Sequence, residues 1–207
     1  PSTIMKPKAL SGTFILATGF ILLLYNGGSR FTMGLMLRPM ADDLSWSRAT
    51  LSLTVTLFMV VSAVVLPVIG RLVDRYRIRT VLLASVLLSS ASVALMSAIQ
   101  TPVQAVVLYG VLFALATAGT SIAPIGVMIS RWFPKRLGLA NSIAISGMGA
   151  GQLVIILLLT AQLESIGWRG AFLVLAGLGL LLVVPLALLS IPEPALPGAE
   201  TSHEPLG

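Results

Sequence analysis

The side chain with the clearest capacity for binding chemistry is Arg30, a single charge inside the apolar stretch LLLYNGGSRFTMGLML, residues 22–37. Asn26 lies about one helical turn before it and Gly34 one turn after it, so the three share a helix face. A guanidinium holds a carboxylate through two parallel hydrogen bonds, and charges at membrane depth are usually functional. We therefore expect Arg30 and Asn26 to bind a substrate anion. The alternative is an arginine that snorkels to the membrane surface or pairs with a structural carbonyl or carboxylate.

A second polar set lies in the apolar region 104–130. Its members are Tyr109, Thr117, Thr120, Ser121 and Pro124, and the last four share one helical face. Small hydroxyls on such a face either line a polar cavity or form hydrogen bonds between helices, and the residues alone leave both open. The cavity interpretation adds Tyr109, Thr117 and Ser121 to the substrate-binding set.

The composition predicts that these side chains lie in a membrane. The chain has 207 residues, of which 57% are hydrophobic and 10% are charged, with a mean hydropathy of +1.01. Soluble domains carry about 25% charged residues, so this composition indicates an integral membrane protein. The formal charge of +6 is dispersed between apolar runs, which argues against a nucleic-acid partner. The chain has no cysteine, and its lone His203 lies near the C-terminal end, so we expect no metal and no cofactor.

Apolar runs of spanning length recur along the chain. A helix needs about 20 residues to cross about 30 Å of hydrocarbon. The run 80–130 is too long for one crossing and breaks at IQTPVQ, residues 99–104. The length of the first run and the runs that follow it argue against a cleaved signal peptide. The sequence therefore predicts an all-α membrane protein with six transmembrane helices at 12–37, 48–70, 80–99, 104–130, 138–162 and 169–191.

The basic residues predict the orientation of these helices, because cytoplasmic segments are enriched in lysine and arginine. With the N-terminus inside, the inner segments hold Lys6, Lys8, Arg71, Arg75, Arg77, Arg79, Arg131, Lys135 and Arg136. The outer segments hold Arg38, Arg48 and Arg169. We therefore expect residues 1–11 and a flexible, proline- and glutamate-rich tail at 192–207 to be cytoplasmic, as in a protein of the bacterial inner (plasma) membrane.

The stretch GRLVDRYRIR, residues 70–79, joins the second and third predicted spans on the inner side. An ordinary basic inner loop would explain its arginines, but not an aspartate four residues after a helix-ending glycine. The stretch resembles the loop signature of the major facilitator superfamily, G-x-x-x-D-R-x-G-R-R. This resemblance implies a gating loop at the inner surface. The matching residues are Gly70, Asp74, Arg75 and Arg79.

A second resemblance is carried by SRWFPKRLGLANSIAISGMGAGQ, residues 130–152. It is similar to the connection between spans 4 and 5 of monocarboxylate and oxalate/formate transporters in the same superfamily, and LSWSRATLS (44–52) and GWRGAF (167–172) resemble the same group. The resemblance covers about residues 10–192 and implies the N-terminal six-helix half of a twelve-helix transporter. It also implies that the first and fourth spans, which hold Arg30 and the hydroxyl set, line the substrate path.

A faint internal repeat agrees with this fold. When spans 1–3 are superposed on spans 4–6, Asp74 and Arg79 fall in the loop equivalent to that of Glu164 and Arg169. A repeat of three plus three helices is a common way to build half of a transporter.

The glycines of the fifth predicted span resemble a dinucleotide-binding fingerprint at Gly147, Gly149 and Gly151. No strand precedes them and their flanks are apolar, which argues against that site. Gly147 and Gly151 also form a G-x-x-x-G pair, and we expect them to serve close helix packing.

The residues as a whole favour a transporter rather than an enzyme, because no catalytic constellation lies at membrane depth. With a second six-helix half, either a missing C-terminal half or another copy, the chain would carry a small monocarboxylate-like organic anion across the lipid bilayer by alternating access. Two alternatives stay open. One is a truncated or non-transporting membrane scaffold, and the other is a facilitator half that exports an uncharged or drug-like substrate.

Overall fold

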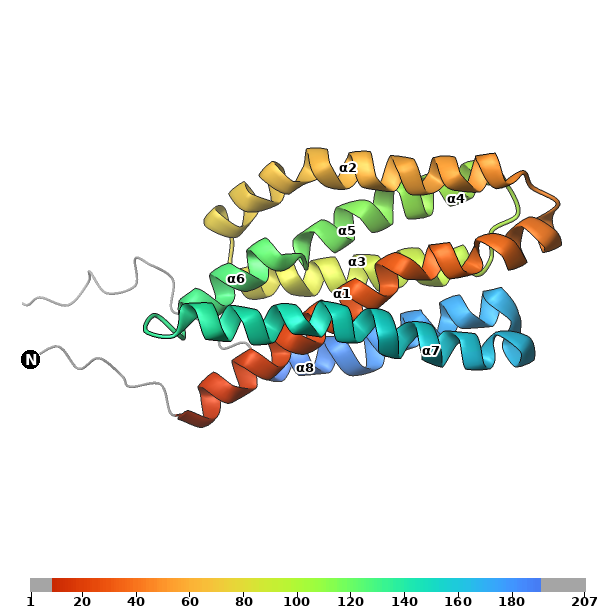
Figure 1. Cartoon of the computed structure of the whole chain (residues 1–207). Helices are drawn as coiled ribbons and strands as arrows, with labels where there is room; N and C mark the ends of the chain where they lie inside the picture. The colour runs from red at the N-terminus through yellow and green to blue at the C-terminus, as the bar shows by residue number, and fades with distance from the viewer. Residues whose placement is uncertain (1–8, 191–207) are drawn as a thin grey trace, which may run out of the picture.

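The computed structural model of the protein describes residues 9–190. Residues 1–8 of the predicted N-terminal segment and the predicted tail 192–207, with His203, lie outside the described residues. Within residues 9–190 every element is helical, and the long helices lie side by side in one elongated bundle (Figure 1). The predicted all-helical class is thus confirmed.

The bundle begins with three long helices, α1 (Ala9–Leu44), α2 (Arg48–Arg75) and α3 (Ile78–Met96). Next come α4 (Pro102–Ala105), the π-helical segment η1 (Val106–Phe113), α5 (Ala114–Gly119) and α6 (Ile122–Ser130). The described part ends with α7 (Leu137–Leu178), the π-helical segment η2 (Gly179–Val183) and α8 (Val184–Ser190). From α4 to α5 the chain coils without a break, whereas Thr120 and Ser121 interrupt it before α6.

Five helical stretches among the described residues are long and apolar enough to cross a membrane: Gly12–Leu44, Arg48–Arg75, Ile78–Met96, Pro102–Ser130 and Leu137–Leu189. The fifth has 53 residues and includes Gly167, whose φ of 66° lies in the left-handed region that favours glycine. Figure 1 shows the chain reversing direction within this stretch, at the end of the bundle where α1 meets α2.

The predicted loop at residues 70–79 is wrong in its extent. α2 continues to Arg75, and only two residues separate it from α3. Ile69 and Val73 are buried one turn apart, and their packing offsets the weak helix propensity of Gly70, which is about 1 kcal/mol relative to alanine. A Cβ at Gly70 would meet no described atom within 4 Å, so the close backbone approach that glycine permits is not used there.

The first helix also exceeds its prediction, because α1 runs to Leu44 instead of residue 37. Met36 and Met40 are fully buried one turn apart, so side-chain packing continues through Pro39. At 1.5 Å per residue, Arg30 lies about 21 Å from the end of α1 at Leu44. Arg30 is therefore nearer to the middle of its helix than the predicted span implied.

The most extensive helix contact is that of α1 with α7. Gly147 and Gly151 are buried on the α7 side of this contact. A Cβ at Gly147 would overlap the backbone carbonyl of Phe20, and a Cβ at Gly151 would overlap the backbone of Leu24. The absence of side chains at these positions lets the two backbones approach, as small residues do in membrane helix pairs.

Two arginines tie α3 to the last helix at opposite ends of the bundle. Arg79, near the start of α3, donates through Nη2 to the carbonyl of Leu188 in α8 at 2.9 Å. Arg169, after the turn in α7, donates through Nη1 to the carbonyls of Ser97 and Ile99, just past the end of α3, at 2.8 and 3.2 Å. Unpaired carbonyls at a helix C-terminus carry partial negative charge, so each contact is electrostatically favourable.

Candidate functional site

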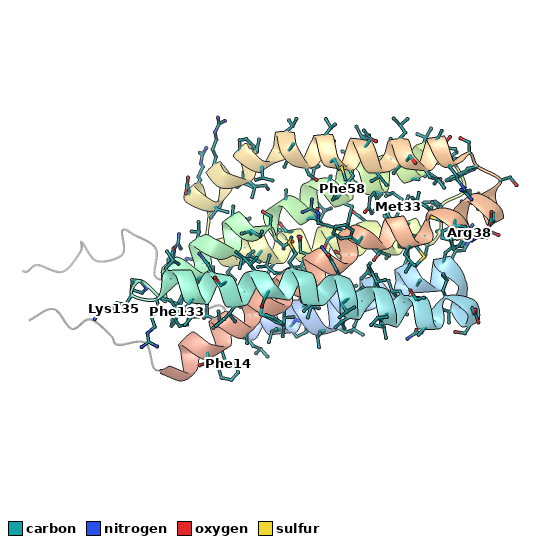
Figure 2. The ribbon with its side chains drawn as sticks, viewed as in Figure 1. Phe14, Met33, Arg38, Phe58, Phe133 and Lys135 are labelled. Atoms are coloured by element: carbon teal, nitrogen blue, oxygen red, sulfur yellow. The ribbon has the colours of Figure 1, made fainter. Side chains whose placement is uncertain are left out.

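A pocket of about 140 Å³ opens beside Arg30, between α1, α2 and η1. Figure 2 shows Phe58 on the side of α2 that faces α1. The pocket beside Arg30 is lined by Arg30, Phe31 and Gly34 of α1, by Val55, Phe58 and Met59 of α2, and by Tyr109 of η1. The part of the chain that the structure describes has no cluster of His, Asp or Glu suited to a metal ion. The chemistry available in this pocket is that of one cation among aromatic and apolar walls.

The guanidinium of Arg30 is held by an aromatic face rather than by an anion. Its Cζ lies 5.4 Å from the centroid of the Phe58 ring, which is the distance range of a cation–π interaction. Across residues 9–190 the Arg30 side chain forms no hydrogen bond and no ion pair. No described residue therefore supplies the structural carbonyl or carboxylate partner that the sequence left open for Arg30. The five N–H donors of the guanidinium form no hydrogen bond with a described residue and are available to a ligand.

Tyr109 fixes the backbone beside this charge. Its hydroxyl donates to the carbonyl oxygen of Arg30 at 2.6 Å, and its side chain is buried. Its ring centroid lies 5.1 Å from that of Phe58 and 4.9 Å from that of Phe113, within the range of favourable aromatic pairs. Tyr109 belongs to the π-helical segment η1, a geometry that is frequent at functional sites. It thus positions Arg30 and supplies a wall of the pocket.

Asn26 lies outside the lining of this pocket, in a buried bridge between α1 and α5. Its Nδ2 donates to the carbonyl oxygen of Thr117 at 2.8 Å and to Oγ1 of Thr120 at 2.9 Å. The Thr117 hydroxyl is itself satisfied, because it donates to the carbonyl of Phe113 at 2.9 Å. The Oδ1 atom of Asn26 is buried without a hydrogen-bond partner among the described residues. This bridge matches the interhelical role that the sequence left open for the hydroxyl set.

Ser121 lines a different pocket, of about 120 Å³, between α2 and α6. Gly70 and Asp74 line the same pocket from the end of α2. Ser121 has an extended backbone where the helix breaks before α6, and its buried Oγ has no hydrogen-bond partner within residues 9–190. The fold therefore brings one predicted binding residue together with two predicted gating residues.

The remaining gating residues contribute in other ways. Asp74 and Arg75 are exposed at the end of α2, and neither takes part in a hydrogen bond or ion pair with another described residue. Arg79 points instead to α8, where it holds the Leu188 carbonyl. Among the described residues, Asp74 therefore pairs neither with an arginine nor with a helix N-terminus.

Comparison with known proteins identifies the fold family. The profile of the Major Facilitator Superfamily matches residues 19–206. The chain belongs to the major facilitator superfamily. The resemblance inferred from the sequence is thus confirmed, and a major facilitator is an integral membrane transporter rather than an enzyme.

Among the relatives of this major facilitator chain is the uncharacterised MFS-type transporter YcxA of Bacillus subtilis, 24% identical over 91% of the chain and 46% of its own length. The probable anion transporter 3, chloroplastic, of Arabidopsis thaliana is 32% identical over 86% of the chain and 35% of its own length. Monocarboxylate transporter 14 of Mus musculus is 28% identical over 82% of the chain and 33% of its own length. The chain thus spans about a third to a half of the length of these three relatives.

The sequence did not reveal two features of this major facilitator site. Phe58 lies among the exposed Met59 and Val60, and no local pattern separates it from side chains that face lipid. Its partner Arg30 is 28 positions earlier, so only the packing of α2 on α1 joins them. The sequence also did not show that the predicted substrate-binding residues lie in separate places. Residues on one helical face contact different neighbouring helices along its length, so a shared face does not bring them into one pocket.

Proposed function

We propose that this chain is the N-terminal, six-span half of a transporter that carries a small organic anion, of the monocarboxylate type, by alternating access. The observation that carries the proposal is the Arg30 guanidinium, which lines a pocket and has no anionic partner among the described residues. A bidentate carboxylate would satisfy that charge. The names of two relatives, an anion transporter and a monocarboxylate transporter, agree with this substrate class.

The six-span count rests on the length of the last apolar stretch. A helix of 53 residues would be about 80 Å long, against about 30 Å of hydrocarbon. We infer that it crosses twice, with the turn at Gly167, which gives six spans. The third and sixth spans, α3 and the last helix, occupy equivalent places in the two predicted repeats. Arg79 and Arg169 link these two spans at opposite ends of the bundle, which supports a 3+3 arrangement.

The orientation rests on charge. We call the end of the bundle with the α2–α3 and α6–α7 connections the basic end, and the other the opposite end. The described basic residues at the basic end are Arg71, Arg75, Arg77, Arg79, Arg131, Lys135 and Arg136. Because cytoplasmic segments are enriched in such residues, we infer that the basic end and both termini are cytoplasmic in a bacterial inner membrane.

Each part of the site then has a role in alternating access. Arg30 binds the anion carboxylate, and Tyr109 holds the backbone that carries Arg30. Asn26 and Thr117 couple α1 to α5, so that the two helices move as one body. A second six-helix half, either a C-terminal half or another copy, completes the path, and the two halves rock about the bound anion.

The gate would lie at the basic end. Ser121 shares a pocket with Gly70 and Asp74, and Arg75 follows on the same helix. The exposed carboxylate of Asp74, which has no ion-pair partner among the described residues, is a group that a second half can pair with when the inner side closes.

The test is transport by the purified chain in liposomes, alone and together with a six-helix half from a relative. Uptake of labelled lactate, formate and oxalate would be measured for the parent, Arg30→Ala and a control, Arg71→Ala, which removes an exposed charge at the basic end. We expect uptake that Arg30→Ala abolishes and Arg71→Ala retains. Uptake of these anions that survives in Arg30→Ala would refute Arg30 as the anion site. The absence of anion uptake in every arrangement would favour the non-transporting scaffold or the uncharged or drug-like substrate.

A further inference from the structure

A second basic pocket lies at the opposite end of the bundle. It has a volume of about 330 Å³, and its lining residues are Gly34, Leu37 and Arg38 of α1 and Arg48 and Ser52 of α2. The two arginines come from different helices and meet because α1 and α2 are joined by a short turn at residues 45–47. Figure 2 shows Arg38 at this end, close to the α1–α2 connection.

The charge in this pocket is unbalanced. Arg38 and Arg48 are both exposed, and within the described range neither forms a hydrogen bond or an ion pair. The nearby Asp43 is already engaged, since its Oδ2 accepts from Trp168 Nε1 at 3.0 Å and lies 3.8 Å from Arg169 Nη2. No acidic side chain is among the described residues that line the pocket. Asp42, one helical turn after Arg38 on α1, is exposed and offsets part of this charge. The two guanidinium groups in one hollow still leave a net positive potential that concentrates anions.

This pocket adjoins the one that holds Arg30. Gly34 lines both, and a Cβ at Gly34 would meet no described atom within 4 Å. Arg30, Gly34 and Arg38 succeed one another at intervals of four residues on α1, so the Cα atoms of the two arginines lie about 12 Å apart along the helix. On α2, Arg48, Ser52 and Val55 follow the same course. The two pockets therefore meet at Gly34, which places no side chain between them.

We propose that Arg38 and Arg48 form an outer capture site for the carboxylate of the substrate anion, which then moves past Gly34 to Arg30. This inference rests on the proposed function and adds the first binding step to it. A capture site acts chiefly on association, because its field raises the local anion concentration before Arg30 is reached. Its contribution falls with ionic strength, since the screening length shortens from about 10 Å at 0.1 M salt to about 3 Å at 1 M.

The experiment measures the binding kinetics of labelled oxalate to the purified chain in nanodiscs of neutral phosphatidylcholine, by rapid filtration at low and high salt. The capture variant is Arg38→Gln with Arg48→Gln. Its matched control is Arg71→Gln with Arg131→Gln, which removes two exposed arginines at the basic end. We expect the capture variant to lower the association rate about tenfold at low salt and less than twofold at 1 M salt. We expect the dissociation rate of the capture variant, and both rates of the control variant, to equal those of the parent.

A steric variant tests the passage itself. Gly34→Leu places a side chain where the structure has free space on a helix, so we expect the fold to persist. We assign slowly dissociating oxalate to Arg30 and rapidly dissociating oxalate to the outer pocket. In Gly34→Leu the rapid exchange should remain, and the slowly dissociating component should be lost. A Gly34→Leu chain that keeps the slow component would contradict the passage.

The outcomes separate the two proposals. Binding that depends on Arg30 but is insensitive to Arg38→Gln with Arg48→Gln refutes the capture site alone. Binding that is unchanged in Arg30→Ala but lost in the capture variant refutes the proposed role of Arg30, and it leaves an outer anion site without a transfer step. Equal effects of the capture and control variants, or no oxalate binding by the parent, overturn the inference. Oxalate binding that is lost when the chain is placed in nanodiscs of phosphatidylglycerol, in a manner that depends on Arg38 and Arg48, would assign the pocket to a lipid headgroup. That result would also overturn the inference.

Discussion

The contact of α1 with α7 makes a sharp prediction at Gly151. In Gly151→Ala the new Cβ would overlap the carbonyl oxygen of Leu24, and it would lie 2.6 Å from the carbonyl carbon and 2.8 Å from the Cα of the same residue, whereas ordinary contacts begin at 3.4 Å. These neighbours are backbone atoms, which cannot rotate away as a side chain would. Relief of the contact with the carbonyl carbon alone requires the two helices to separate by about 0.8 Å, which is 3.4 minus 2.6 Å, and the overlap with the carbonyl oxygen requires more. A gap of that size forfeits about a quarter to a half of the dispersion energy at the interface.

The expected destabilisation is about 2–3 kcal/mol, in the range of overpacked interiors. The matched control is Gly149→Ala, two residues earlier on the same helix, where the new Cβ would meet no described atom within 4 Å. There the better helix propensity of alanine predicts a stabilisation of up to about 1 kcal/mol. The two single-methyl variants should therefore differ by about 3 kcal/mol.

Thermal unfolding of both variants in the same detergent gives the comparison. For a chain of this size, about 3 kcal/mol corresponds to roughly 6–12 °C between the melting temperatures. Gly151→Ala should be below the parent and Gly149→Ala at or above it. Equal melting temperatures for the two variants would refute the argument that backbone approach at Gly151 holds α1 to α7.

Three further substitutions test other parts of the site. Tyr109→Phe removes the hydroxyl bond to the Arg30 carbonyl but keeps the ring, so we expect a loss of about 0.5–1.5 kcal/mol in unfolding and weaker oxalate binding; unchanged binding would show that this bond does not position the charge. Asn26→Leu breaks the buried bridge to α5 and should destabilise by about 1–3 kcal/mol in denaturant unfolding, and a neutral result would contradict that bridge. Arg169→Gln should lose about 1–3 kcal/mol, chiefly from its carbonyl contacts and from the cation–π contact of its Cζ with the Trp168 ring at 4.2 Å, because the half-exposed ion pair with Asp43 contributes less than about 1 kcal/mol. If Asp43→Asn destabilises as much as Arg169→Gln, the carbonyl contacts are not the main contribution.

Much of the architecture could be predicted from the sequence because membrane spans depend on local composition. The apolar runs and the interruption near Pro102 are local signals, and the helices begin and end close to them. The end of α2 was misjudged because Gly70 looks like a helix terminator, while the packing of Val73 that keeps the helix going is a tertiary effect. The first span was predicted to end at residue 37, before Arg38, whereas the buried Met36 and Met40 continue α1 through Pro39 to Leu44, which is again a tertiary effect.

The candidate site was only partly accessible to sequence reasoning. A charge in an apolar run is visible without a structure, and so Arg30 could be singled out. Its contacts with Phe58 and Tyr109 depend on how α2 and η1 pack against α1, which no spacing along the chain encodes. The meeting of Arg38 and Arg48 is set by the turn between two helices, and the sequence presents them only as two interface arginines.

The most direct test of the central claim is the distance between the Arg30 guanidinium and a bound carboxylate. Solid-state NMR on the chain in lipid, with ¹⁵N-labelled arginine and ¹³C-labelled oxalate, detects a carboxylate carbon within about 4 Å of a guanidinium nitrogen. Bidentate N–H···O contacts of about 2.7–2.9 Å predict such a coupling. The measurement uses a chain that also carries Arg38→Gln and Arg48→Gln, so that the outer pocket contributes no guanidinium. In that chain the account predicts a coupling that disappears in Arg30→Lys, which has no guanidinium nitrogen at position 30, and persists in Arg71→Lys. A coupling that survives in Arg30→Lys, or its absence from that chain at saturating oxalate, would contradict the assignment of Arg30 as the anion site.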